Sequence, residues 1–142
     1  GSAIVEGLGD RVEPCAGETS LDLVLVFPEV ACPTGEVFAA FDRISDPLLR
    51  ADEVRALAAE DQVGPVAPFN DLAEAARHVA PRLGEVMSRV SRLAERPAHV
   101  SGSGSTLFVL CDDTLHAEAL ARAVAEQLDL PAVAARATDR CD

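Results

Sequence analysis

The chain has 142 residues, of which 49% are hydrophobic and 25% charged, a size and composition typical of a single globular domain spanning residues 1–142. Its net charge is −12 and all twelve basic residues are arginines, so it lacks the basic surface that nucleic-acid binding requires. It contains no apolar run of the roughly 20 residues that a membrane helix needs and no signal-peptide pattern, which predicts a cytoplasmic protein that does not contact membranes.

The N-terminal residues predict a hairpin followed by a buried strand. Residues 3–6 and 11–14 flank Gly7-Leu8-Gly9-Asp10, and glycines at turn positions between two short runs are typical of a hairpin. The almost continuous apolar run Leu21–Phe27, which Pro28 ends, predicts a central, buried strand.

Two short helices are expected next. Thr34 is a candidate N-cap for the first helix, and Asp46-Pro47 opens the second. Residues 61–69, with one glycine and two prolines, predict a loop. The first helix is expected to carry Val37, Phe38 and Phe41 on one face. The apolar residues of the second are Leu48, Leu49, Val54 and Leu57.

The middle of the chain predicts two further helices. Asn70 can cap a helix over residues 71–79, and Asn70-Asp71 is interpreted as a helix start that fixes a loop rather than as a catalytic pair. Pro81 breaks or restarts this helix. The next segment has the three- and four-residue spacing of an amphipathic helix, with apolar positions Leu83, Val86, Met87, Val90, Leu93 and Ala94.

The C-terminal third predicts a strand hairpin, a helix and a closing strand. The hairpin consists of residues 98–100 and 106–111, and residues 112–114 cap a helix that reaches Leu128. A strand over residues 130–137 follows, and the last five residues are expected to fray. The order of elements predicts an α+β fold, an antiparallel sheet covered by helices on one face.

The segment Ser101-Gly102-Ser103-Gly104-Ser105, called the glycine loop below, is the candidate functional motif. Its glycines permit positive φ and close ligand approach, and its hydroxyls and successive amides can donate to phosphate oxygens. The alternative is a tight turn filled with small polar residues. The motif is not a Walker A loop, because it lacks the lysine, and it is not a dinucleotide-binding fingerprint, because it lacks the third glycine. It is not the loop of a nucleophilic serine either, because it does not join a strand to a helix.

No metal site is predicted. The four cysteines form no CxxC pair and are interpreted as unreactive thiols rather than disulfides, and the three histidines lack metal-ligand spacing. Asp112-Asp113 is interpreted as the acidic start of a helix, where carboxylates favour the helix dipole, rather than as a magnesium site.

Four motifs, in this order, resemble a known family. They are Ala3–Asp10, Leu25–Pro28 with Pro33–Phe38, Phe69–Leu72, and His99–Phe108. Together they are similar to the C-terminal half of the GHMP small-molecule kinases, and most similar to those that phosphorylate 4-diphosphocytidyl-2-C-methyl-D-erythritol in the non-mevalonate isoprenoid pathway. Gly35 departs from this pattern, because the family often has proline there.

The resemblance implies a ferredoxin-like C-terminal domain, preceded by the N-terminal hairpin, of an enzyme that transfers the ATP γ-phosphoryl group to the 2-hydroxyl of the cytidine substrate. ATP and Mg²⁺ would be cofactors of the parent enzyme. The family's phosphate loop and catalytic Asp and Lys belong to the N-terminal half, so no catalytic residue is assigned here and the chain alone is expected to be inactive.

The same resemblance implies roles for six residues. The glycine-loop residues Ser101, Gly102, Ser103 and Gly104 would shape the nucleotide–substrate cleft. Phe38 would stack on the cytosine ring, the alternative being a core aromatic. Thr34 would contact the substrate or cap its helix, and the cap is favoured.

Two other functions stay open: another GHMP kinase, such as a homoserine or mevalonate type, and a non-catalytic α+β ligand-binding domain.

Overall fold

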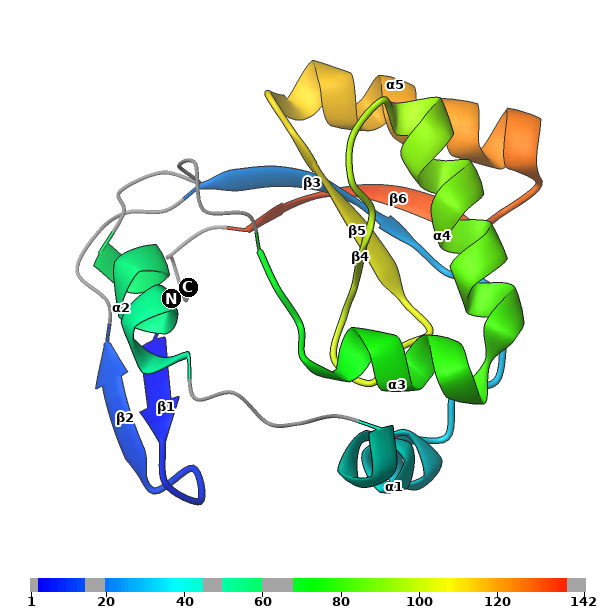
Figure 1. The fold of residues 1–142 in the computed structure, drawn as a ribbon. Coiled ribbons are helices and arrows are strands. Elements are labelled where there is room, and N and C mark those ends of the chain that lie inside the picture. Colours follow the sequence, from blue (N-terminus) through cyan, green and yellow to red (C-terminus); the bar gives the residue numbers. More distant parts are fainter. Residues whose placement is uncertain (1–2, 15–19, 45–49, 60–67, 138–142) are drawn as a thin grey trace. The chain divides into compact units, whose positions relative to one another are not determined.

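The computed structural model describes residues 3–14, 20–44, 50–59 and 68–137 (Figure 1). Internal contacts divide the chain into two compact units. The smaller unit comprises residues 1–21, 48–68 and 136–142, and the larger comprises residues 22–47 and 69–135. The single domain expected from the sequence stays a prediction.

The smaller unit contains the predicted hairpin. Strands β1 (Ala3–Glu6) and β2 (Arg11–Pro14) pair antiparallel, so the predicted bounds are confirmed. The helix of this unit, α2 (Ala51–Ala59), lies within the predicted second helix, whose first residues fall outside the described part of the chain. The Arg55 guanidinium donates to Glu6 Oε1 at 2.9 Å and ties α2 to β1.

The larger unit is built around a four-stranded sheet with the order β4-β5-β3-β6 (Figure 1). β5 pairs antiparallel with both β4 and β3, which confirms the predicted antiparallel α+β layout. The strands and helices of this unit are β3 (Leu21–Val26), α1 (Thr34–Ile44), α3 (Leu72–Val79), α4 (Pro81–Ala94), β4 (His99–Val100), β5 (Leu107–Cys111), α5 (Thr114–Leu128) and β6 (Ala132–Ala137).

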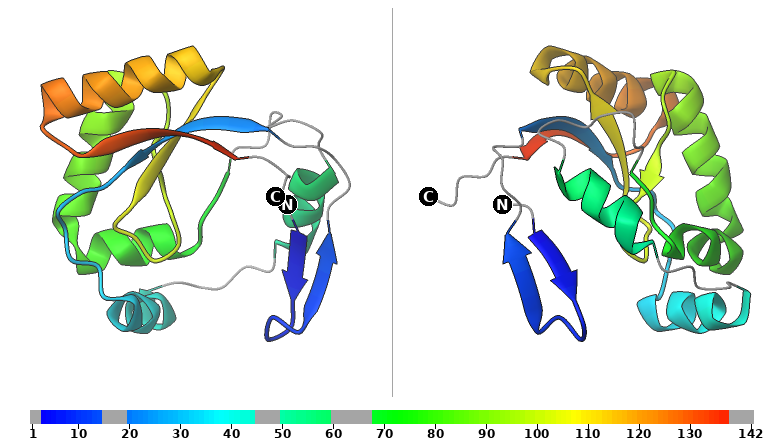
Figure 2. Two further views of the ribbon diagram at one scale, coloured as in Figure 1. Left: turned by 180° about the vertical axis from the view of Figure 1, so that it is seen from behind. Right: turned by 60° about the vertical axis from the view of Figure 1, so that its left-hand side comes forward.

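Alternation along the strands decides which side chains form the core. Helices α4 and α5 lie over one face of the sheet (Figure 2). Val24 and Val26 of β3 point to that face and are fully buried, as is Val109 of β5. Leu23 and Leu25 point to the other face and are half-buried. β3 is therefore interior in the sheet, as expected, and one of its faces is fully buried at Val24 and Val26 while the other is only partly covered.

Helix starts follow the capping signals in the sequence. The Asn70 side-chain oxygen accepts from the Leu72 amide at 3.0 Å, and Pro81 occupies the first turn of α4. The Asp113 carboxylate accepts from the His116 amide at 2.7 Å at the start of α5. The predicted starts of α3, α4 and α5 are thus confirmed. No helix of the described residues is long and apolar enough to cross a membrane.

The β4–β5 pair carries a stacked histidine whose titration tests the packing of the sheet. The rings of His99 and Phe108 lie with centroids 5.2 Å apart, and burial lowers the pKa of His99. Unfolded His99 has an ordinary pKa of about 6.5, so below that pH the unfolded chain takes up the proton more readily than the folded one. Acidification from pH 7.5 to 5.5 should therefore reduce the free energy of unfolding.

Urea unfolding of wild type and His99→Phe at both pH values measures this contribution. The phenylalanine keeps a ring against Phe108 but cannot titrate, so its stability should fall less on acidification. An equal fall in both proteins would contradict the assignment.

Candidate functional site

The glycine loop joins β4 to β5 as the tip of a hairpin, as the sequence predicts. The Ser101 amide donates to the Thr106 carbonyl at 2.9 Å, and the Gly104 amide donates back to the Ser101 carbonyl at 3.0 Å. Gly102 and Gly104 have φ of 55° and 87°, values that L side chains adopt rarely. Both glycines are therefore required by the backbone of the loop.

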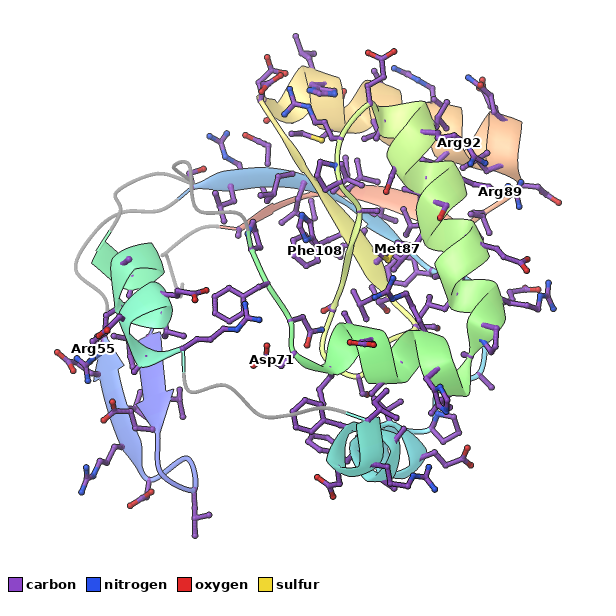
Figure 3. All side chains as sticks on the ribbon, in the orientation of Figure 1. Arg55, Asp71, Met87, Arg89, Arg92 and Phe108 are labelled. Carbon is purple, nitrogen blue, oxygen red and sulfur yellow. The ribbon has the colours of Figure 1, made fainter. Side chains whose placement is uncertain are left out.

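Asn70 clamps the glycine loop to the start of α3. Its side-chain nitrogen donates to the Val100 carbonyl at 2.8 Å and to the Gly102 carbonyl at 2.7 Å, while its side-chain oxygen accepts from the Leu72 amide. One amide group thus holds the last residue of β4, the loop and the first turn of α3, which begins beside Asp71 (Figure 3). The helix start was readable from the sequence, but the bonds to the loop join residues about thirty positions apart and have no local signal.

Thr34 connects α1 to the glycine loop. Its hydroxyl lies 2.9 Å from the Ser103 hydroxyl, and either oxygen can donate. The first turn of α1 bonds instead to the Pro33 carbonyl, which accepts from the Glu36 and Val37 amides at 3.0 and 3.1 Å. The bond that the structure shows for the Thr34 side chain therefore differs from the helix cap that the sequence favours.

Phe38 does not lie on the core face of α1. Val37 and Ala40 are fully buried there, whereas Phe38 is 51% exposed. The predicted apolar face combining Phe38 with Val37 was therefore wrong. Thr34 and Phe38 are four residues apart and share one side of the helix, and Thr34 contacts Ser103. The exposed ring thus belongs to the side of α1 that meets the glycine loop.

The polar groups in the loop and the thiol beside it are neutral. Ser105 donates to the Pro28 carbonyl at 3.3 Å, and the half-buried Cys32 thiol lies beside Gly104. Burial raises the pKa of Cys32, so its thiol stays protonated near neutral pH and is a poor nucleophile. The loop offers hydroxyls and amides for an anionic group, and its glycines, which lack side chains, leave room for close approach.

The acidic pair after β5 has structural partners. Arg96 donates to the Asp112 carboxylate and is the main cause of the lowered pKa of that group, with a smaller contribution from His116. Asp113 caps α5. Asp113 thus caps the helix start that the sequence indicates, whereas Asp112 pairs mainly with Arg96, which follows α4.

Comparison with known proteins identifies the family. The family described as "GHMP kinases C terminal" matches residues 47–130. A 4-diphosphocytidyl-2-C-methyl-D-erythritol kinase of Rhizorhabdus wittichii is 41% identical over 135 residues, covering 89% of this chain and 42% of the relative. The kinase of the same name from Caulobacter sp. strain K31 is 35% identical over 132 residues, covering 85% of this chain and 43% of the relative.

A solved structure agrees with these relatives. The crystal structure of a 4-(cytidine 5'-diphospho)-2C-methyl-D-erythritol kinase superposes with a TM-score of 0.70 and 28% identity, covering 94% of this chain and 48% of that protein. The chain belongs to the GHMP kinase C-terminal family. It spans less than half the length of these relatives.

Gly102 and Gly104 form a matched pair for testing the loop. A Cβ on Gly104 would lie 3.2 Å from Cys32 Sγ and 3.4 Å from a Leu83 methyl carbon, whereas a Cβ on Gly102 would meet nothing within 4 Å. Gly102→Ala should therefore cost about 1–2 kcal/mol, the penalty of a left-handed backbone alone. Gly104→Ala should cost more, because crowding adds to the unfavourable φ. Chemical denaturation measures both, and equal costs would show that the neighbours of Gly104 give way.

Asn70→Asp isolates the clamp from the helix cap. Aspartate keeps an oxygen for the Leu72 amide but replaces the nitrogen that donates to the Val100 and Gly102 carbonyls. Loss of these bonds should destabilise the protein by about 1–3 kcal/mol and speed amide exchange in the glycine loop. Asn70→Ala should show the same loop exchange and additionally loosen the first turn of α3. Unchanged exchange at residues 101–105 in both variants would rule out the clamp.

Proposed function

We propose that this chain is the substrate-side part of an ATP-dependent kinase that phosphorylates the 2-hydroxyl of 4-diphosphocytidyl-2-C-methyl-D-erythritol. The observation that carries the proposal is the Thr34–Ser103 hydrogen bond, which joins the helix bearing the exposed Phe38 to the glycine loop. The curated relatives named above support the substrate, and their greater length supports a further part that carries the catalytic residues.

The glycine loop would hold phosphate groups between nucleotide and substrate. Phosphoryl transfer depends mainly on positioning and on donors aimed at the developing charge. The Ser101 and Ser103 hydroxyls and the loop amides suit phosphate oxygens, and the absence of side chains at Gly102 and Gly104 lets a ligand approach the backbone closely. ATP and Mg²⁺ are the cofactors that this reaction implies. ATP would supply the phosphoryl group, and Mg²⁺ would neutralise part of its negative charge.

Phe38 and Thr34 would bind the acceptor. An exposed phenyl ring provides a stacking surface for the cytosine base. Thr34 would contact the substrate one helical turn earlier while its bond to Ser103 keeps α1 against the loop. A base-stacking ring has no use in a kinase for a homoserine- or mevalonate-type acceptor, which favours the cytidine substrate over those family members. A small-molecule substrate and a nucleotide would accordingly be the partners, in the cytoplasm where both occur.

Phe38→Ala tests the substrate assignment in a polypeptide that joins this chain to the rest of the kinase. Loss of the stacking ring should cost about 1–3 kcal/mol of substrate binding, a roughly 5- to 150-fold rise in the substrate Kd, with little change for ATP. Calorimetric titration of each ligand measures both affinities. Ile44→Ala is the matched control, because Ile44 is 39% exposed and lies at the other end of the same helix.

Two outcomes would contradict the proposal. An unchanged substrate Kd in a folded Phe38→Ala variant would remove the cytidine assignment. An equal loss of substrate affinity in Ile44→Ala would show that the effect comes from helix stability alone.

This chain by itself should show no turnover in an activity assay, because the phosphate loop and the catalytic Asp and Lys are expected outside it. Turnover that follows this chain through purification would show that expectation to be wrong.

A further inference from the structure

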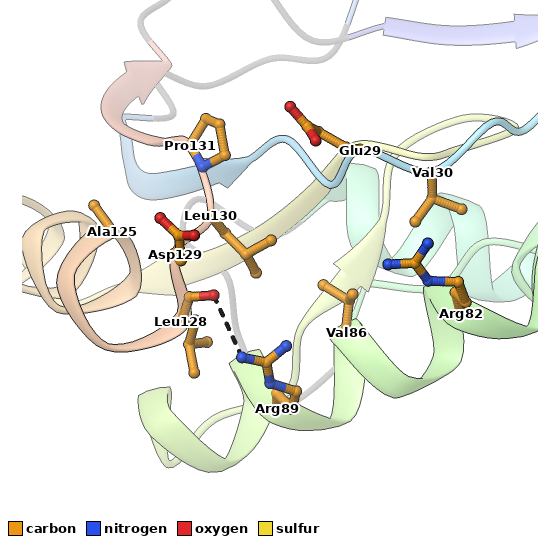
Figure 4. A pocket seen from close by; sticks show the side chains of 10 residues that line it. All are labelled: Glu29, Val30, Arg82, Val86, Arg89, Ala125, Leu128, Asp129, Leu130 and Pro131. Carbon is orange, nitrogen blue, oxygen red and sulfur yellow. Dashed lines mark hydrogen bonds between the residues drawn. The ribbon is translucent and has the colours of Figure 1, made fainter.

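The larger unit contains a pocket that the proposed function does not use. It has a volume of about 520 Å³ and lies between α4, the end of α5 and the segment that follows β3 (Figure 4). Neither the glycine loop nor its hydrogen-bond partners Asn70 and Thr34 contribute to its lining. The lining residues are Glu29, Val30, Arg82, Val86, Arg89, Ala125, Leu128, Asp129, Leu130 and Pro131.

The pocket combines an apolar floor with two cations. Val86 is buried and continuous with the core, and Leu130 packs against the same core. Arg82 and Arg89 are seven residues apart on α4, almost two full turns, so both project from the face that carries Val86 between them (Figure 4). Their guanidinium groups border the space above the valine.

Two carboxylates complete the charged border. Glu29 follows β3, and Asp129 ends α5 in a left-handed conformation with φ 55°. The left-handed conformation is one that aspartate adopts more readily than most side chains, but the C-terminal end of a helix repels its negative charge. Arg89 offsets part of this by donating to the Leu128 carbonyl at 3.3 Å.

These charged groups retain hydrogen-bonding capacity for a ligand. Within the described residues, Glu29, Arg82 and Asp129 form no ion pair or side-chain hydrogen bond. Arg89 uses one of its five donors on Leu128. The pocket thus presents unpaired cations and unpaired acceptors around an apolar floor, a combination suited to a ligand with both an anionic group and donors.

We propose that this pocket binds a small polyhydroxylated anion, such as a sugar phosphate or a sugar acid. The phosphate or carboxylate group pairs with Arg82 and Arg89, whose planar guanidinium groups match either anion. Hydroxyls of the same molecule donate to the carboxylates of Glu29 and Asp129. The carbon skeleton rests on Val86 and Leu130. A bare anion would satisfy the arginines while facing two carboxylates, so it should bind more weakly.

The test is titration of the ¹⁵N-labelled full chain with glucose 6-phosphate and with gluconate. One carries a phosphate and the other a carboxylate on a hydroxylated skeleton, so the pair identifies the preferred anion. Inorganic phosphate and glucose are the component controls. We expect saturable shifts of the Val30, Val86 and Leu130 amides with at least one of the two acids, and at least about tenfold weaker binding of both components.

Matched variants locate the site. Arg82→Gln removes one charge but breaks no hydrogen bond or ion pair among the residues that the structure describes. It should weaken binding about tenfold or more. Arg92→Gln removes the same charge from an exposed position of α4 outside the pocket and should leave the affinity unchanged (Figure 3). Ser103→Ala, in the glycine loop, should also leave it unchanged, which separates this site from the proposed kinase site.

Several results would overturn the proposal. They are the absence of saturation with both acids, an equal loss in Arg92→Gln and Arg82→Gln, or shifts confined to the glycine loop. Binding of glucose as tight as that of the acids would also overturn it, because the arginines would then have no role.

Discussion

Burial of one face of the four-stranded sheet beneath α4 and α5 is the constraint on which the larger unit depends. Val24 and Val26 of β3 and Leu107 and Val109 of β5 point to that face and are fully buried. Because side chains alternate along a strand, a shift of one residue between β3 and β5 would move the buried side chains of the shifted strand to the other face. The core therefore determines the register, and the register determines where β5 begins and the glycine loop ends.

The loop itself is held by segments far from it in sequence. Asn70 bonds its carbonyls from the start of α3, Thr34 reaches Ser103 from the start of α1, and Ser105 bonds the Pro28 carbonyl after β3. Three separate segments thus fix one short turn. A binding site must be held within a fraction of an ångström of its working geometry, and several independent anchors provide that rigidity.

The two candidate sites offer ligands different chemistry. The glycine loop presents hydroxyls and amides, whose dipoles suit phosphate groups that are already partly neutralised by other charges. The pocket beside α4 presents Arg82 and Arg89 together with Glu29 and Asp129. In a chain whose net charge is −12, Arg82 and Arg89 provide local positive charge beside α4 with which an anionic group can pair. The two sites are therefore expected to select different ligands.

The sequence by itself determined the local structure and the family. Turn glycines marked the β1–β2 hairpin, Asn70 and Asp113 marked helix starts, and the apolar spacing of α4 predicted its buried face. These signals depend on residues within a few positions of each other, where steric and hydrogen-bonding rules act directly. The ordered motifs likewise predicted the family, because they preserve residue types at fixed positions along the chain.

The tertiary structure alone decided how these pieces meet. The Asn70 clamp, the Thr34–Ser103 bond and the exposure of Phe38 each depend on packing between segments 30 to 69 residues apart. The same holds for the pocket, whose charged residues come from α4, the end of α5 and the segment after β3. A local pattern cannot encode such contacts, because they result from the burial of all the apolar faces at once.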